Sequence, residues 1–128
     1  MKQLKIYVTC GEASGDLQAS FLVSAIKKHY PNNVLLYGIG GKELSNLGQQ
    51  QIYNITSLSV MGIIEILPKL FSILRIIRST VRDIITIKPD IIITVDSPDL
   101  NIRIVRKLAN RISSKTKFIQ LIAPSVWA

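Results

Sequence analysis

Two carboxylates and an amide follow an apolar run in the last third of the chain. The run is Ile-Ile-Ile-Thr-Val at residues 91–95, and it continues into Asp96, Ser97, Pro98, Asp99, Leu100 and Asn101. A short run of mostly β-branched residues bounded by turn formers is typical of a strand buried on both faces of a parallel sheet. Ligands bind beyond the carboxyl ends of such strands, so this stretch predicts a functional site.

The two carboxylates of this stretch differ in the roles open to them. Pro98 fixes its own φ and disfavours helix at Ser97, so the chain should turn there and leave Asp99 to cap the next helix. Helix capping is therefore the role that the pattern favours for Asp99. Asp96 ends a buried strand, where an ionised carboxylate is costly to desolvate unless it is paired or used in chemistry.

A loop of small residues follows the first expected strand. Residues 11–16 read Gly-Glu-Ala-Ser-Gly-Asp and lead into a helix, whose N-terminal amides could face an anion. The glycine spacing fits neither the dinucleotide-binding fingerprint nor a P-loop. A tight turn capped by Ser14 or Asp16 is the structural alternative, and only Glu12 has no evident part in it. A second glycine-rich turn, at residues 38–41, is expected to allow close backbone packing rather than phosphate contact.

Strand-like and helix-like stretches alternate along the chain. Strands are expected at residues 4–9, 34–39, 90–95 and 117–122, with a weaker one at residues 51–55. Helices are expected between the first two strands, over residues 59–88 and over residues 101–112. This order predicts an α/β fold with a doubly wound, mostly parallel sheet.

Helical spacing indicates which face of two of these helices packs on the sheet. In the first helix the apolar residues at that spacing are Leu17, Phe21, Leu22, Ala25 and Ile26. In the last helix they are Ile104, Val105, Leu108 and Ile112. The basic residues of the last helix are expected to face outward, and they are Arg103, Arg106, Lys107 and Arg111.

The longest expected helix, over residues 59–88, should be kinked or broken at Pro68. Its apolar arc is too broad for one core face. Its polar stripe is narrow, and the basic residues beside the apolar arc are Lys69, Arg75, Arg78 and Arg82. An interfacial helix combines these features, because apolar side chains enter the acyl region while cations meet lipid phosphates. The alternative is a crossover helix buried between the sheet and a further part of the protein, and the two interpretations are compatible.

Length and composition limit the class of protein. A chain of 128 residues fits one domain with a single core. Hydrophobic residues make up 48% of it and charged residues only 19%, so we expect apolar surface to remain for a partner. The net charge of +8 favours polyanionic partners. Nucleic acid is disfavoured, because the basic residues are spread over several elements and aromatic residues amount to only 6%.

Cys10 and His29 are the single residues of their types. We therefore expect no disulfide framework, no metal cluster of cysteine and histidine, and a reducing compartment. The chain opens without a secretory leader pattern and has no apolar stretch long enough to span a bilayer. The sequence thus predicts a cytoplasmic protein, with no metal ion or cofactor indicated.

Taken together, five segments resemble lipid-A-disaccharide synthase in residue type, order and spacing. They are residues 11–16, 59–67, 88–90, 96–101 and 124–128. The resemblance covers essentially the whole chain. It implies a glycosyltransferase of two Rossmann-like domains, in which residues 1–128 belong to the N-terminal half, the acceptor-side domain. It also implies that the UDP-binding residues lie mainly in a C-terminal domain absent from this chain.

The resemblance further implies a reaction in lipid A biosynthesis. That family transfers 2,3-diacylglucosamine from UDP-2,3-diacylglucosamine to 2,3-diacylglucosamine 1-phosphate (lipid X), giving lipid A disaccharide 1-phosphate and UDP with inversion. Asp96 would deprotonate the acceptor 6-hydroxyl. The implied substrate-binding residues are Glu12, Ser14, Met61, Gly62, Glu65, Asp99, Asn101 and Ser125. The implied acyl or membrane contacts are Ile63, Ile66, Leu67, Lys69, Leu70, Phe71, Leu74 and Arg75.

Partners follow from the same resemblance. They are the two lipid-linked sugar substrates, an anionic inner-membrane surface, and either the missing C-terminal half or a second copy of the chain. Without the second domain, the isolated chain is expected to have little or no turnover. A non-catalytic peripheral membrane module that binds acidic lipids is the alternative function, and a nucleotide-binding protein is a third.

Overall fold

The structure, a computed structural model, describes residues 3–30, 33–55, 69–95, 98–108, 111–112 and 115–122. The strands in this part of the chain are β1 (Leu4–Cys10), β2 (Val34–Gly40), β3 (Gln50–Asn54), β4 (Ile91–Val95) and β5 (Lys117–Leu121). The helices are α1 (Ala13–His29), α2 (Lys42–Asn46), α4 (Lys69–Ile87) and α5 (Pro98–Leu108). Each strand expected from the sequence is present, with bounds that differ by no more than one residue at either end.

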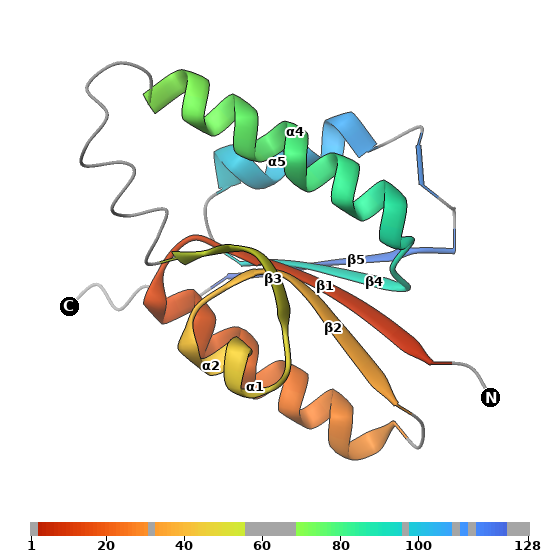
Figure 1. Ribbon diagram of the computed structural model, residues 1–128. Coiled ribbons are helices and arrows are strands. Elements are labelled where there is room, and N and C mark those ends of the chain that lie inside the picture. The colour runs from red at the N-terminus through yellow and green to blue at the C-terminus, as the bar shows by residue number, and fades with distance from the viewer. Residues whose placement is uncertain are drawn as a thin grey trace.

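The strands form one sheet in the order β3-β2-β1-β4-β5, and every neighbouring pair is parallel. Figure 1 shows α1 and α2 on one face of the sheet, and α4 and α5 on the other. The predicted doubly wound parallel sheet is therefore confirmed. Because the strands run in one direction, their C-terminal ends meet at a single edge, which we call the carboxyl edge.

Side chains of the central strand β1 alternate between the two faces. Ile6, Val8 and Cys10 pack in a buried cluster with residues of α1 and α2. Tyr7 points the other way and packs with buried residues of α4 and α5, which are Ile77, Val81, Ile84, Ile104 and Leu108. Both faces of β1 are thus buried, as the mostly apolar sequence of the strand indicates.

The buried face of α1 matches the predicted one only in part: Leu22 and Ile26 are partly buried and pack against the core as expected. Its buried residues are Gly15, Asp16, Ala19, Ser20 and Val23, whereas Leu17 is 44% and Phe21 66% exposed. Small residues allow the helix to approach the sheet closely: a Cβ on Gly15 would lie 3.0 Å from Val95 Cγ1. The apolar side chains Leu17 and Phe21 therefore remain on the surface, as do Phe118, Ile119 and Ile122 in and after β5.

Helix α5 also departs from its prediction at two points. It begins at Pro98, so Asp99 lies inside its first turn rather than capping it from outside. Proline suits the first helical position, because its φ is already helical and its missing N–H is not needed there. Ile104 and Leu108 are fully buried as expected, but Val105 is 38% exposed.

Gly38 belongs to β2 and not to a turn after it, so the predicted turn at residues 38–41 begins too early. Its φ is +129°, and a Cβ there would lie only 2.0 Å from the backbone oxygen of Val8. The glycine thus permits close backbone approach, as predicted, while the β2–β3 register shifts between Gly38 and Ile39.

Helix α4 ends at Ile87, and Lys88 follows with a left-handed φ of 55°. Tyr7 Oη donates to Asp83 Oδ2 at 2.8 Å, which ties α4 to β1. None of the helices in the described ranges is long and apolar enough to cross a lipid bilayer. Residues 56–68, where the expected helix would begin, lie outside the described residues.

Candidate active site

The two central strands end level at the carboxyl edge. Cys10, the last residue of β1, pairs with Val95, the last residue of β4. Val95 is only 1% exposed. Asp96, the candidate catalytic residue, directly follows Val95 in the sequence and lies outside the described residues. The last described residue before Asp96 is therefore held at the centre of the sheet.

Glu12 and Ser14 are exposed at the same edge. Glu12 is the N-cap residue of α1 with an extended backbone (φ −140°, ψ 156°), and its side chain makes no capping hydrogen bond. The predicted capping of this helix by Ser14 or Asp16 is thus wrong. The Glu12 backbone carbonyl accepts the Asp16 N–H at 3.0 Å, and the residue is exposed to solvent.

Asp16 is a buried carboxylate that holds two elements together. It is 3% exposed, and its Oδ1 accepts the backbone N–H groups of Gly41 at 2.8 Å and Leu44 at 3.1 Å. Its Oδ2 accepts the N–H of Glu43 at 2.8 Å. These amides belong to the N-terminus of α2, where a negative charge also interacts favourably with the helix dipole. Asp16 therefore anchors α2 to α1 at the carboxyl edge.

The signal in the sequence for this role of Asp16 lies at the start of α2, not within α1. The N-cap residue of α2 is Gly41, which has no side chain to satisfy the first amides of the helix. An acceptor must then come from elsewhere in the fold. A Cβ on Gly41 would lie 2.9 Å from Asp16 Oδ2, so the glycine also makes room for that acceptor.

Cys10 lies beneath this anchor and is buried. Its Sγ donates to the Ile39 carbonyl at 3.3 Å. Burial, and then the charge of Asp16, raise the pKa of the thiol to about 12. A cysteine in this state remains protonated at neutral pH and is a poor nucleophile. Cys10 is thus part of the core rather than of the candidate chemistry.

Side-chain amides fix the β3 side of the carboxyl edge. Gln49 Nε2 donates to the carbonyls of Val8 at 3.3 Å and Tyr37 at 3.1 Å. Gln51 Nε2 donates to Gln49 Oε1 and to the Gly41 carbonyl, both at 2.9 Å. This network joins β1, β2 and β3 next to the shift in register. The sequence analysis did not predict these hydrogen bonds of Gln49 and Gln51.

The other predicted site residues differ in how much of each the structure describes. Leu74 on α4 is half-buried, and Arg75 beside it is exposed. Only the backbone is described for the helical candidates Lys69, Leu70, Phe71, Asp99 and Asn101. The others lie outside the described residues, and they are Met61, Gly62, Ile63, Glu65, Ile66, Leu67, Ser125 and the catalytic candidate Asp96. Glu12 and Ser14 thus lie together at the carboxyl edge, while Leu74 and Arg75 lie on the α4 layer.

The topology defines the class of protein. A parallel sheet of order 3-2-1-4-5, covered by helices on both faces, is a Rossmann-like α/β fold. Residues 6–128 match the family described as lipid-A-disaccharide synthetase, and the chain belongs to this family.

Three relatives show the extent of the similarity. The chain is 38% identical to the lipid-A-disaccharide synthase of Pseudoalteromonas translucida over 127 residues, and 42% identical to that of Psychromonas ingrahamii over 127 residues. It is 38% identical to that of Rickettsia bellii over 125 residues. These matches cover 97–99% of this chain but only 32% of each relative. The chain thus spans about a third of the length of these relatives, rather than the half that the resemblance implied.

Proposed function

We propose that this chain is the acceptor-side part of an inverting glycosyltransferase of lipid A biosynthesis. The match of residues 6–128 to the lipid-A-disaccharide synthetase family carries this proposal. The reaction would transfer 2,3-diacylglucosamine from UDP-2,3-diacylglucosamine to lipid X. Since the chain covers 32% of the relatives, the UDP-binding part would be supplied by the remainder of the protein.

In the proposed reaction, Asp96 accepts the proton of the acceptor 6-hydroxyl. The oxygen of that hydroxyl forms a bond to the anomeric carbon of the donor, and the bond from that carbon to UDP breaks with its electron pair leaving on UDP. An ordinary aspartate, with a pKa near 4, is a weak base. UDP must therefore be a good leaving group, or the pocket must raise the pKa of Asp96.

The position of Asp96 in the sequence supports this role. It comes one residue after Val95, which is buried and paired with β1. Catalytic side chains in open parallel sheets follow the carboxyl ends of central strands in this way. Glu12 and Ser14, both exposed after β1, are proposed to bind sugar hydroxyls beside it. The other proposed substrate-binding residues are Met61, Gly62, Glu65, Asp99, Asn101 and Ser125.

Both substrates carry acyl chains, so the enzyme would work at the cytoplasmic surface of the inner membrane. We propose that the start of α4 and the segment before it contact acyl chains or the membrane. The exposed Arg75 and the half-buried Leu74 support this, because a cation beside an apolar side chain suits the headgroup region.

The test is a chimera that joins residues 1–128 to the remainder of the Pseudoalteromonas translucida enzyme. UDP release would be measured with lipid X and UDP-2,3-diacylglucosamine in detergent. The Asp96→Asn variant should lose at least about 100-fold in kcat, the usual contribution of a general base. Asp99→Asn, the same change in the same segment, should lose less, because Asp99 is proposed to orient substrate rather than to take the proton.

Two results would contradict the proposal. One is a folded chimera that binds both substrates and releases no UDP. The other is an Asp96→Asn chimera with undiminished turnover. Circular dichroism and thermal unfolding of each variant show whether a loss of activity reflects a loss of fold.

A non-catalytic module that binds acidic lipids is the second candidate function. One observation favours it: Arg75, Arg78 and Arg82 on α4 are all exposed. Both functions predict binding to anionic vesicles. Only the transferase predicts UDP release that depends on Asp96.

A further inference from the structure

One row of the sheet, directly inside the carboxyl edge, consists of polar residues. Thr9 of β1 pairs in register with Thr94 of β4, and Thr94 pairs with Gln120 of β5. Because side chains alternate along each strand, this row faces α4 and α5, as does the row of Tyr7 and Ile92 two residues nearer to the amino ends. Tyr7 and Ile92 belong to the buried core on that face. This face of the sheet thus becomes polar as it approaches the carboxyl edge.

A hydrogen bond joins two members of the polar row. Thr94 is only 3% exposed, and its Oγ1 donates to Gln120 Oε1 at 2.5 Å. A buried hydroxyl is costly unless it is hydrogen-bonded, and Gln120 meets this need for Thr94. The contact also orients the glutamine amide. Since its oxygen faces Thr94, its NH₂ group points away from Thr94.

The NH₂ group of Gln120 has two donors that are open to a ligand. Gln120 is exposed, and neither donor bonds to any residue within the described ranges. A long exposed side chain normally loses rotamer freedom when it binds a ligand. Because Thr94 already holds the Gln120 amide, less of that freedom is left to lose, and a ligand can bind at a lower entropic cost.

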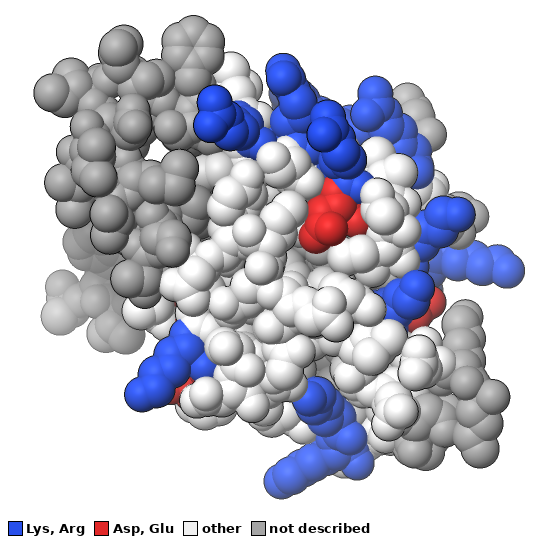
Figure 2. Space-filling model, in the orientation of Figure 1, with Lys and Arg blue, Asp and Glu red and all other residues white. Residues whose placement is uncertain are grey.

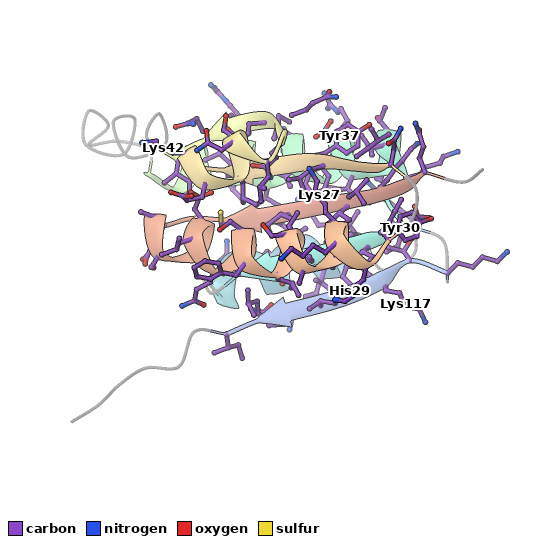
Figure 3. All side chains as sticks on the ribbon, turned by 90° about the horizontal axis from the view of Figure 1, so that it is seen from below. Lys27, His29, Tyr30, Tyr37, Lys42 and Lys117 are labelled. Atoms are coloured by element: carbon purple, nitrogen blue, oxygen red, sulfur yellow. The ribbon has the colours of Figure 1, made fainter. Side chains whose placement is uncertain are left out.

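The surroundings of Gln120 favour an uncharged oxygen as the partner of these donors. Lys117 is the charged residue of β5, and it lies at the amino end of the strand (Figure 3). In the view of Figure 2, lysine and arginine side chains gather mainly over α4. Such cations are the usual partners of phosphate, whereas an amide NH₂ group suits a hydroxyl or carbonyl oxygen. A sugar that carries acyl groups presents both kinds of oxygen.

We propose that Gln120 binds the acceptor sugar of the proposed reaction through its NH₂ group, and that Thr94 is a positioning residue that orients Gln120. Thr94 stands two residues before Asp96, the proposed base, and ligands of open parallel sheets bind at the carboxyl edge. This inference deepens the proposed function and rests on it, because it assigns the acceptor sugar to the β4–β5 side of that edge.

The first test changes Gln120 in the chimera with the Pseudoalteromonas translucida enzyme. Gln120→Glu keeps an oxygen for the Thr94 hydroxyl but replaces the two donors by a second oxygen. UDP release is measured against the concentration of each substrate. The KM for lipid X should rise roughly 10-fold, the effect of losing a hydrogen bond and leaving an oxygen unpaired. The KM for UDP-2,3-diacylglucosamine and the kcat should each change by less than about 3-fold, because only binding of the acceptor is affected.

The second test asks whether Thr94 acts through Gln120. Thr94→Val removes the hydroxyl and keeps a side chain of similar shape. Alone, it should raise the KM for lipid X by about 3-fold or more, since the amide is no longer oriented. In the Gln120→Glu background it should raise that KM no further, because the two residues act as one unit. A merely structural role of Thr94 would lower the temperature of thermal unfolding and leave the KM for lipid X unchanged.

Two matched controls make the same changes elsewhere. Gln50→Glu alters an exposed glutamine of β3, at the opposite end of the strand order. Thr116→Val removes a hydroxyl that donates to the Pro89 carbonyl at 3.1 Å, just before β5. Each control should leave both KM values within about 2-fold, as is usual for substitutions away from a site.

A direct measurement on the 128-residue chain does not depend on turnover. The side-chain NH₂ signals of Gln120 are identified by NMR from their absence in Gln120→Glu. Lipid X is then added at a constant detergent concentration. The Gln120 NH₂ signals should shift, and those of Gln50 should stay in place.

Three results would overturn the proposal: an unchanged KM for lipid X in Gln120→Glu, an equal rise in the KM of both substrates, or Gln120 NH₂ signals that lipid X leaves in place. A chimera whose turnover needs Asp96 but not Gln120 would refute this inference and leave the transferase reaction standing. A folded chimera without any turnover would count against the proposed function, and the NMR titration would then decide about Gln120.

Discussion

The buried carboxylate of Asp16 allows a quantitative test of how the carboxyl edge is held. Its two oxygens accept three backbone N–H groups from the N-terminus of α2. In Asp16→Asn, one amide oxygen can still accept the N–H groups of Gly41 and Leu44. The new NH₂ group would face the N–H of Glu43, however, so two donors would meet where a hydrogen bond was.

The expected loss follows from these contacts. A hydrogen bond to a charged group contributes about 1.5–3 kcal/mol. The negative charge at a helix N-terminus adds about 0.5–1 kcal/mol. The neutral amide is less costly to bury, which offsets part of this, so Asp16→Asn should lower the free energy of unfolding by about 2–3 kcal/mol.

Equilibrium unfolding in urea, followed by circular dichroism, measures this loss, and the m-value should not change. Hydrogen exchange of the Gly41, Glu43 and Leu44 amides should become faster than in the unmodified chain. Glu43→Gln is the control: it also removes an acidic group from the first turn of α2, but its effect should stay within about 0.5 kcal/mol. A loss below about 0.5 kcal/mol for Asp16→Asn, or an equal loss for the control, would refute the reasoning.

Two further predictions concern the scaffold around the site. The pKa of Cys10 is raised from 9.0 to about 12 in the folded chain, so its contribution to stability is complete below about pH 9 and is lost as the pH rises through 12. Between pH 8 and pH 10, the free energy of unfolding of the unmodified chain should therefore fall by roughly 1.4 kcal/mol more than that of Cys10→Ala. Equal falls in the two proteins would contradict the raised pKa. Gly38→Ala would place a Cβ 2.0 Å from a carbonyl oxygen of β1, and we expect a loss of at least about 3 kcal/mol in urea unfolding. Gly48→Ala has a similarly positive φ (+95°) but nothing within 4 Å of the new Cβ, so it should cost only about 1 kcal/mol, and comparable losses would show that the contact is not the cause.

The strands and the doubly wound parallel sheet could be predicted from the sequence, because both follow from local patterns. Continuous apolar runs such as residues 91–95 occur where both faces of a strand are buried, and residues 92–95 of β4 are indeed buried. The parallel arrangement follows from the alternation of strands and helices. These features need no knowledge of distant contacts.

The buried face of α1 could not be predicted in this way. Periodicity ranks residues by hydrophobicity and so selected Leu17 and Phe21, which are exposed. The helix instead turns its small residues inward, since a bulkier residue at Gly15 would press on Val95. How closely a helix approaches a sheet depends on the strands beneath it, and those strands are distant in sequence.

Asp16 shows the same limit for a polar residue. An acid in the first turn of a helix has a sufficient local explanation, namely its interaction with the dipole of its own helix. Its carboxylate actually serves α2, whose N-cap residue Gly41 lies 25 positions further along the chain. Only the pairing of β1 with β2 brings the two helices together, so a tertiary contact decides the role of this residue.

The membrane contact proposed for the start of α4 bears on the position of the candidate site. This helix starts just after the segment that follows β3 and ends just before β4, so it runs from the carboxyl edge to the opposite edge of the sheet. If the start of α4 lies on the membrane as proposed, the carboxyl edge beside it is held there as well. A substrate could then keep its acyl chains in the bilayer while its sugar reaches the loop that carries Glu12 and the end of β4. In the proposed reaction, the sugar would then need to leave the headgroup layer by only a short distance.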